Sequence, residues 1–300
     1  MTTPTPQDNE LLKAVSRTFY LSMRLLPAEM RRAVSVAYLL ARASDSVADT
    51  STAAPEQRLA VLRDMARCLN GESDSDETER LLVSLGGAMA QAQKNPAEFR
   101  LLRFFGDCLA QFEALPEIEK APVRRVLGHI LEGQMWDLTA FAETDTVADD
   151  EATRRYTWQV AGCVGEFWTE LGYAVLGERF APADRRAVLT QAAARYGQGL
   201  QLVNILRDRE EDAERGRHYL CSDPAVWMNR AERYLQDGVD YCSRLRGFRL
   251  RLASVLPAML GLKTLKLLCR RQTGRVKISR SCVYRTMARA AFFALCPPRA

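Results

Sequence analysis

Hydrophobic residues recur at steps of three and four along nearly every long segment of this chain. That spacing places apolar side chains on one face of an α-helix, and no run alternates as a half-buried β-strand does. Pro27, Pro55, Pro182 and Pro224 stand where such segments begin, which suits the first turn of a helix. The segments predicted to be helical are Leu11–Tyr20, Pro27–Thr50, Pro55–Leu69, Glu77–Gln93, Glu98–Leu115, Ala121–Phe141, Glu151–Leu176, Pro182–Asp212, Pro224–Leu245, Leu250–Arg270 and Ser279–Leu295.

This pattern predicts an all-α fold. We expect one domain over residues 1–300, with loosely ordered ends at 1–12 and 290–300, because neither a repeat nor a low-complexity linker divides the chain. The composition agrees: 47% of the residues are hydrophobic and 26% are charged, which is ordinary for a globular protein.

Cysteine and histidine usage restricts the metal chemistry. The eight cysteines stand singly without a CxxC pair, so we interpret them as reduced thiols of a cytoplasmic protein. With only His129 and His218 available, a divalent metal is expected to be held by carboxylates. Met1–Glu10 does not resemble a signal peptide, and no apolar run approaches the roughly 20 residues that span a bilayer.

The net charge of +5 is unevenly distributed. Residues Tyr241–Ala300 contain fourteen Lys and Arg and no Asp or Glu. This segment fits a solvated basic face, an anionic ligand site, or peripheral contact with the inner membrane surface. We expect no nucleic-acid partner, because the segment has no binding motif and no aromatic residues regularly interleaved with the basic ones.

A first acidic motif lies within Ala37–Thr50. Asp45 and Asp49 are four residues apart, so on a helix their side chains stack on one face about 6 Å apart. Arg42 lies on the same stripe. The rest of this helix is strongly apolar, and two acids in apolar surroundings require a countercharge. A lone DxxxD is nevertheless weak evidence of function.

A second acidic motif lies within Gln198–Tyr219. Arg207 and Glu211 form a neighbouring pair four residues apart. A charged, solvent-facing helix would explain residues 209–215, but amide side chains among leucine, valine and isoleucine indicate the lining of a pocket. Four polar residues follow at steps of three, four and four: Gln201, Asn204, Asp208 and Asp212.

Two such helices facing one cavity suggest a specific chemistry. Mg²⁺ prefers hard oxygen ligands, and when bound to a diphosphate it stabilises that leaving group. Arg42, Arg207 and Arg217 could hold the phosphate oxygens. We therefore expect ionisation of a diphosphate in an apolar helical cavity, which protects a carbocation from water.

Five motifs in a fixed order resemble the squalene/phytoene synthase family of head-to-head prenyl synthases, from Val15 to about Arg280. This resemblance implies a bundle of the isoprenoid-synthase type with a central apolar cavity. The motifs are SRTF (Ser16–Phe19), YLLARASDSVAD (Tyr38–Asp49), YTWQVAGCVG (Tyr156–Gly165), QLVNILRDREED (Gln201–Asp212) and GRHYL (Gly216–Leu220).

The resemblance also implies roles for individual residues. The four aspartates would bind Mg²⁺ and the substrate diphosphates, with Asn204 and Glu211 in support. Tyr156 would act on the proton that is lost when the cyclopropane ring closes. A phenol with a pKa near 10 is a poor base. We therefore expect the Tyr156 ring to steer a cation and its hydroxyl to relay the proton to the released diphosphate. The residues expected to bind diphosphate directly are Ser16, Arg17, Arg42, Asn204, Arg207 and Arg217.

Further residues are expected to shape the cavity. Gly162 and Gly165 fit close helix contacts or a cavity wall. The stretch with Gly133, Gln134, Met135 and Asp137 matches a pocket-lining segment, and the apolar tunnel is assigned to Phe19, Leu40, Val160, Val164 and Leu202. The chain departs from family habit at Thr157-Trp158 and at Tyr219-Leu220-Cys221, and the second of these changes removes no charged group.

Within the family, Leu256–Leu268 followed by Val276–Arg280 looks closest to bacterial-type squalene synthases. The expected reaction joins two farnesyl diphosphates to presqualene diphosphate, then reduces it to squalene with NADPH held by Lys277 and Arg280, without a GxGxxG turn. Phytoene, dehydrosqualene or presqualene diphosphate synthase, a non-catalytic scaffold of the same fold, and a one-component terpene cyclase are the alternatives. Donor chain length and oligomeric state stay open.

Overall fold

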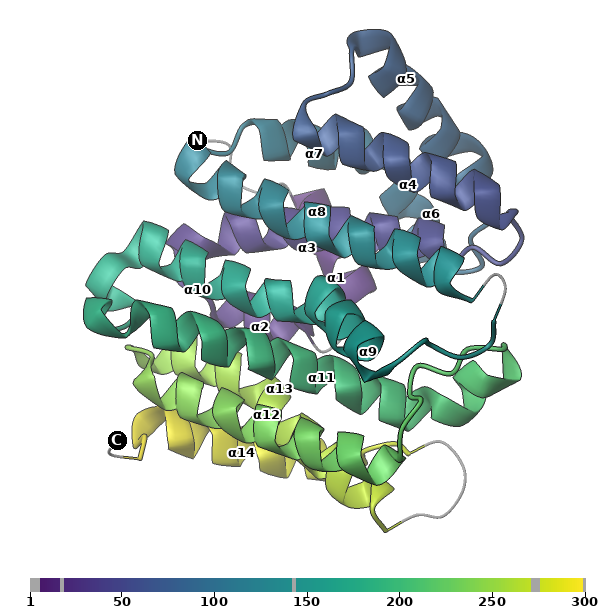
Figure 1. The fold of residues 1–300 in the computed structure, drawn as a ribbon. Helices are drawn as coiled ribbons and strands as arrows, with labels where there is room; N and C mark the ends of the chain where they lie inside the picture. Colours follow the sequence, from purple (N-terminus) through teal and green to yellow (C-terminus); the bar gives the residue numbers. More distant parts are fainter. Residues whose placement is uncertain (1–5, 17–18, 142–143, 271–275, 299–300) are drawn as a thin grey trace. The chain divides into compact units, whose positions relative to one another are not determined.

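The computed structural model describes residues 6–16, 19–141, 144–270 and 276–298 (Figure 1). These residues form helices and contain no β-strand, which confirms the all-α prediction. One isolated bridge joins Thr146 to His218.

By its internal contacts the chain divides into two compact units. Unit 1 holds the residues up to Arg24 together with Ala28–Leu138, and unit 2 holds Leu25–Pro27 and the residues from Thr139 onward. The expectation of one domain over 1–300 stays a prediction. So do the loose ends expected at 1–12 and 290–300, although a helix extends into each of them.

Unit 1 is built around helix α3, whose apolar side is buried. Met30, Leu40 and Val47 are fully enclosed, and α3 packs against α1, α4, α6 and α7. The helices of this unit are α1 (Pro6–Ser16), α2 (Phe19–Leu25), α3 (Ala28–Ala48), α4 (Pro55–Asn70), α5 (Ser75–Ser84), the π-helical turn η1 (Leu85–Met89), α6 (Pro96–Arg103), α7 (Phe105–Glu113) and α8 (Glu117–Ala140), with the last residues of α2 and α8 counted in unit 2.

Unit 2 is built around α11, the longest helix that the structure describes. It packs against α10, α12 and α13, and α14 packs on α13. The helices of this unit are α9 (Asp150–Thr157), the π-helical turn η2 (Trp158–Gly162), α10 (Cys163–Leu176), the 3₁₀ turns η3 (Gly177–Arg179) and η4 (Ala183–Arg185), α11 (Arg186–Glu214), α12 (Pro224–Arg244), α13 (Phe248–Leu268) and α14 (Arg280–Leu295).

Proline marks the beginnings of helices, as predicted. Pro55 and Pro224 are the first residues of α4 and α12, while Pro27 and Pro182 directly precede α3 and η4. Side-chain caps reinforce other starts, since the Asp74 carboxylate accepts from the backbone N–H of Glu77 at 2.8 Å. Such caps satisfy amide groups that a helix leaves without partners.

One predicted helix is interrupted, and the continuity of another stays a prediction. Leu11–Tyr20 covers the end of α1, the start of α2 and residues 17–18, which lie outside the described ones. Glu98–Leu115 is interrupted at Phe104, where ψ rises to 7° and α6 gives way to α7. Both α6 and α7 bury their apolar faces, so the hydrophobic spacing continues across the break and does not reveal it.

Candidate functional site

The first acidic motif lies at the end of α3. The helix ends at Ala48, but the Asp49 N–H donates to the Asp45 carbonyl at 2.9 Å, so both aspartates share one helical turn. The Asp49 side chain is exposed, and 49% of the Asp45 side-chain surface is open to solvent. The two carboxylates are therefore accessible to a ligand.

The Asp45 carboxylate is held from two sides. Arg42 Nη1 donates to its Oδ2 at 3.0 Å, and Gln134 Nε2, from α8, donates to its Oδ1 at 3.0 Å. Burial raises the pKa of Asp45, and the Arg42 charge and the Gln134 hydrogen bond oppose that rise. Arg42 Nη2 also donates to Glu98 Oε1 at 2.5 Å. The expected countercharge is thus Arg42, which serves two carboxylates.

The second acidic motif lies on one continuous helix, α11, as its spacing predicted. Arg207 holds the neighbouring Asp208 through two hydrogen bonds, of 2.9 Å from Nε to Oδ1 and 2.5 Å from Nη2 to Oδ2. Asn204 is exposed, and its amide donates to the Gln201 side chain at 3.3 Å. A hollow of about 440 Å³ lies beside this part of α11, lined by Arg207, Asp208, Glu210, Glu211, Glu214 and Arg215.

Helix α11 ends in a turn that positions the GRHYL segment. Gly216 adopts a φ of 69°, which favours glycine, and the Arg217 N–H donates back to the Asp212 carbonyl at 2.9 Å. His218 then pairs with the chain at residues 145–147, donating its N–H to the Asp145 carbonyl at 2.7 Å. The backbone of Arg217 is therefore fixed directly after the second acidic motif.

Tyr156 is buried and stacks on Tyr219 of the GRHYL segment. The ring centroids are 5.2 Å apart, and the ring planes differ by 15°. The Thr153 hydroxyl, fully buried one turn before Tyr156, donates to the Tyr219 carbonyl at 2.6 Å, and Phe141 meets Tyr219 edge-on at 5.1 Å. Two motifs more than fifty residues apart in the sequence thus form one aromatic cluster.

The residues after Tyr156 form a π-helical turn that packs tightly on α11. Gln198 of α11 donates its side-chain amide to the Arg154 carbonyl at 3.0 Å. A Cβ on Gly165 would lie 2.0 Å from the Ala193 carbonyl oxygen, so only glycine permits this approach of α10 to α11. π-Helical turns are frequent at functional sites. The expected helix-contact role of Gly165 is confirmed.

Three other predicted binding residues are described by the structure. Ser16 ends α1, where its buried hydroxyl donates to the Leu12 carbonyl, and Arg17 lies outside the described residues. Lys277 and Arg280 are exposed in unit 2, at the approach to α14 and at its first residue. Their roles in binding diphosphate and NADPH stay predictions.

The tunnel residues are distributed through both units. Phe19 stacks on Tyr38 at 5.5 Å, while Leu40 and Leu202 are at most 1% exposed within the cores of units 1 and 2 respectively. The apolar tunnel itself stays a prediction.

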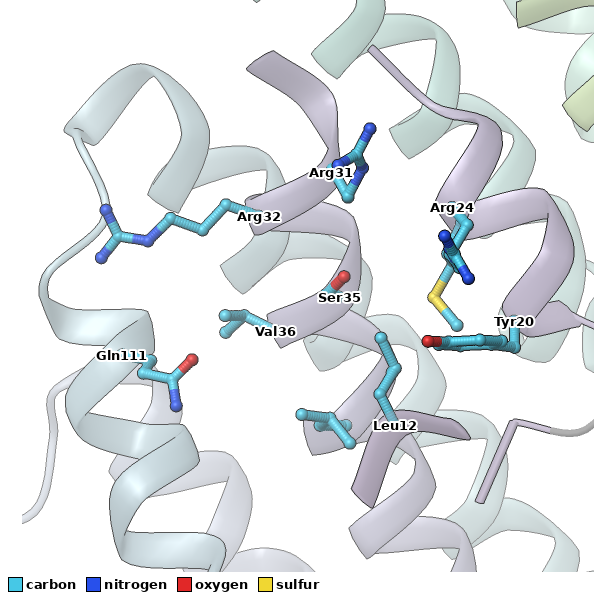
Figure 2. A pocket seen from close by; sticks show the side chains of 10 residues that line it. Leu12, Tyr20, Arg24, Arg31, Arg32, Ser35, Val36 and Gln111 are labelled. Carbon is cyan, nitrogen blue, oxygen red and sulfur yellow. The ribbon is translucent and has the colours of Figure 1, made fainter. Parts of the chain in front are cut away.

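Unit 1 also contains a small cavity of about 40 Å³, shown in Figure 2. It has no carboxylate in its lining, and Figure 2 shows the Tyr20 ring lying beside Arg24. None of the predicted catalytic or diphosphate-binding residues belongs to it. The lining is Leu12, Tyr20, Met23, Arg24, Arg31, Arg32, Ser35, Val36, Leu39 and Gln111.

The donor chemistry of the two acidic motifs suits Mg²⁺. Each motif supplies two partly accessible carboxylates, whereas a group of three or more His, Cys, Asp or Glu placed to hold a metal does not occur among the described residues. Mg²⁺ commonly takes one or two carboxylates and completes its shell with water and substrate phosphate. Metal binding by Asp45 and Asp49 of unit 1, and by Asp208 and Asp212 of unit 2 with Asn204 and Glu211 in support, stays a prediction.

Two contributors to these clusters were not predicted. Glu98 binds Arg42 from α6, and Thr153 holds Tyr219. Each belongs to a helix with an ordinary spacing of apolar and polar residues, so only its contact with a residue distant in the sequence reveals its role.

Comparison with known proteins places the chain in a family. The model of the family described as squalene/phytoene synthase matches residues 12–228, and the chain belongs to this family.

Relatives in the family carry more than one activity. The chain is 27% identical over 224 residues to the bifunctional lycopene cyclase/phytoene synthase of Blakeslea trispora, matching 74% of this chain and 33% of that protein. It is 26% identical to the squalene synthase of Schizosaccharomyces pombe, over 70% of this chain and 42% of that one. It is 30% identical to the 15-cis-phytoene synthase of Synechocystis, over 75% and 58%. The chain thus spans about a third to three fifths of the length of these curated relatives.

Solved structures share the fold. A ligand complex of the protein named TcSQS matches with a TM-score of 0.72 at 21% identity, covering 96% of this chain and 88% of that one. A dehydrosqualene synthase with a bound ligand matches with a TM-score of 0.64 at 19% identity, covering 96% and 95%. These likenesses show the squalene synthase fold for this chain.

Proposed function

We propose that this protein is a Mg²⁺-dependent prenyltransferase that condenses two farnesyl diphosphates head to head and reduces the presqualene diphosphate to squalene with NADPH. The observation that carries the proposal is the pair of acidic motifs, each on one helix and each with an arginine bound to an aspartate. Membership of the squalene/phytoene synthase family supports the same class of reaction.

The arginines bind both the resting carboxylates and, in this proposal, the substrate. A bound Mg²⁺ would supply charge neutralisation of the diphosphate leaving group. Arg42 and Arg207 hold Asp45 and Asp208. If these carboxylates held the metal ion, the guanidinium groups would be available to phosphate oxygens. Arg217, whose backbone is fixed at the end of α11, adds a third cation.

Tyr156 acts on the carbocation and its proton. The ring of Tyr156, on α9, is held against the GRHYL segment by its stack on Tyr219. The face of the ring therefore has a defined orientation. A fixed aromatic face attracts a cation, and the phenolic hydroxyl passes the proton on to the released diphosphate.

NADPH is the proposed reductant, with Lys277 and Arg280 as its anchors. Both side chains are exposed, as cations that meet a large phosphate-bearing cofactor must be. The family match ends at residue 228, before Lys277 and Arg280. This part of the proposal therefore rests only on the sequence around these two residues.

The non-reductive reaction is the second candidate, because the chain is 30% identical to a phytoene synthase. Such a member keeps the metal chemistry, omits hydride transfer and makes phytoene, dehydrosqualene or presqualene diphosphate. A non-catalytic scaffold is disfavoured, since all four aspartates are present.

Product analysis separates these candidates. Purified protein is incubated with farnesyl diphosphate and Mg²⁺, with and without NADPH, and the products are identified by gas chromatography–mass spectrometry after dephosphorylation. Squalene only with NADPH supports the full proposal. The same non-reduced product with and without NADPH rejects the reductive step. A parallel incubation uses geranylgeranyl diphosphate as the donor. If only this incubation gives a product, the longer donor is assigned.

We propose a cytoplasmic location, at the inner surface of the membrane. All eight cysteines are free, which suits a reducing compartment. No helix among the described residues is long and apolar enough to cross a membrane. The basic segment from Tyr241 onward provides the charge for a peripheral contact.

A further inference from the structure

Helix α14 is anchored to its unit by one face. Thr286, Ala290 and Phe293 point inward and are buried, and α14 packs on α13 at the edge of the unit (Figure 1). Arg251 of α13 donates to the Ala294 carbonyl at 2.6 Å, which fixes the end of the helix, and the Ser279 hydroxyl caps its start by accepting from the Cys282 N–H at 3.3 Å. The outer face of α14 therefore has a fixed orientation.

That outer face carries large apolar side chains in one stripe. Tyr284 and Phe292 are each 69% exposed and Leu295 is 66% exposed, with exposed Ala288 between them. Steps of four, four and three place these positions on one side of a helix. Single exposed apolar residues are common on protein surfaces, but a continuous stripe marks an interaction site.

Arginines border this stripe on both sides. By helical rotation Arg280 lies along one edge, while Arg285 and Arg289 lie along the other, and all three are exposed. No Asp or Glu occurs anywhere from Tyr241 to Ala300, so neither α13 nor α14 offers an acidic side chain to neutralise them.

We propose that this α14 face, made of Tyr284, Ala288, Phe292 and Leu295 with its bordering arginines, docks onto an anionic membrane surface. The inference rests on the peripheral location proposed above and identifies the face that makes the contact. The apolar stripe would enter the boundary between head groups and acyl chains, and the arginines would pair with lipid phosphates.

The same features disfavour other occupants. A twofold contact between two copies would bring the same unneutralised arginines together. A nucleic acid would use the arginines but leave Phe292 and Leu295 in water. An anionic bilayer is the partner that satisfies both the charge and the apolar stripe.

Vesicle flotation tests the proposal on the full chain. Vesicles of phosphatidylglycerol mixed with phosphatidylcholine are compared with vesicles of phosphatidylcholine alone, and the binding of each variant is titrated. We expect the wild type to float with the anionic vesicles only. Tyr284→Ser with Phe292→Ser should weaken that binding at least about tenfold, because two buried aromatic side chains are lost.

Neutralising Arg285→Gln with Arg289→Gln should weaken binding by roughly thirtyfold, and added salt should weaken the wild type in the same direction. The matched controls are Ile118→Ser with Val188→Ser, two apolar residues 57% and 60% exposed elsewhere, and Arg63→Gln on α4. These controls should bind as the wild type does. Circular dichroism verifies that each variant is folded.

Three outcomes would overturn the proposal: equal flotation with both vesicle types, unchanged binding in the folded α14 variants, or no flotation of the wild type with the anionic vesicles. Because the readout is vesicle binding and not product formation, each leaves the proposed reaction untouched.

Discussion

The Asp45 carboxylate is held by one side chain from its own helix and by one from a distant part of the chain. Asp45 receives a charged donor from Arg42 and a neutral donor from Gln134, and these two bonds occupy both of its oxygens. The Gln134 amide is uncharged. Its hydrogen bond therefore orients the Asp45 carboxylate without competing with a metal cation for that carboxylate. Residues of this kind typically change metal affinity ten- to a hundredfold when removed.

Replacing Gln134→Ala should therefore raise the Mg²⁺ concentration needed for half-maximal turnover by about tenfold or more, with a smaller change in the maximal rate. The measurement is a Mg²⁺ titration of prenyl diphosphate turnover. Gln91→Ala, an exposed glutamine of the same unit, is the control. An unchanged Mg²⁺ requirement in Gln134→Ala would contradict the role of Gln134 in positioning Asp45 for the metal.

The buried hydroxyl of Thr153 makes a second testable contact. Thr153→Val keeps the shape of the side chain but leaves the Tyr219 carbonyl without this donor, which should cost about 1–3 kcal/mol of unfolding free energy. Thr190→Val should change it by less than about 0.5 kcal/mol, because that hydroxyl bonds within the surface of α11. Urea denaturation measures both, and equal values would argue against a structural role for this bond.

At the scale of elements, the contact between α10 and α11 depends on glycine. Gly165 of α10 meets the Ala193 carbonyl of α11, and Gly197 of α11 meets the Ala161 carbonyl of η2, so α11 approaches both elements backbone to backbone. This approach holds η2, and with it the residues that follow Tyr156, against the helix that carries the second acidic motif.

Gly165→Ala should accordingly lower the free energy of unfolding by about 2–4 kcal/mol, since the new methyl group cannot be accommodated without moving a helix backbone. Gly128→Ala on α8 is the matched control. Its added Cβ meets nothing within 4 Å, so a stabilisation of about 0.5–1 kcal/mol is expected. Thermal and urea denaturation compare the two, and a neutral Gly165→Ala would refute the close contact.

The elements were largely predictable because apolar spacing and proline positions report local structure. Their interruptions were not: the break at Phe104 and the π-helical turn from Trp158 lie inside patterns that remain helical in period. The acidic motifs were also visible, because four-residue spacing on one helix is a local property. Contacts such as Glu98 with Arg42, or Thr153 with Tyr219, depend on the fold and have no local pattern.

At the scale of the whole molecule, the chemistry and the charge are distributed unequally. The first acidic motif belongs to unit 1, while the second, Tyr156 and the basic segment belong to unit 2. The family match covers the first three of these and ends at residue 228, before the basic segment begins. The proposed catalytic part is therefore shared with relatives, whereas the proposed membrane face is argued from this chain alone.

The central claim is that both acidic motifs are required for turnover. The most direct test is the steady-state rate at which single variants form product from farnesyl diphosphate in the presence of Mg²⁺. Asp45→Asn and Asp212→Asn should each lose about a thousandfold or more in rate while remaining folded, because several kcal/mol of leaving-group stabilisation depend on the metal. Asp64→Asn and Asp240→Asn, exposed acids on α4 and α12, should keep the wild-type rate. A wild-type rate in Asp45→Asn or in Asp212→Asn would contradict the account.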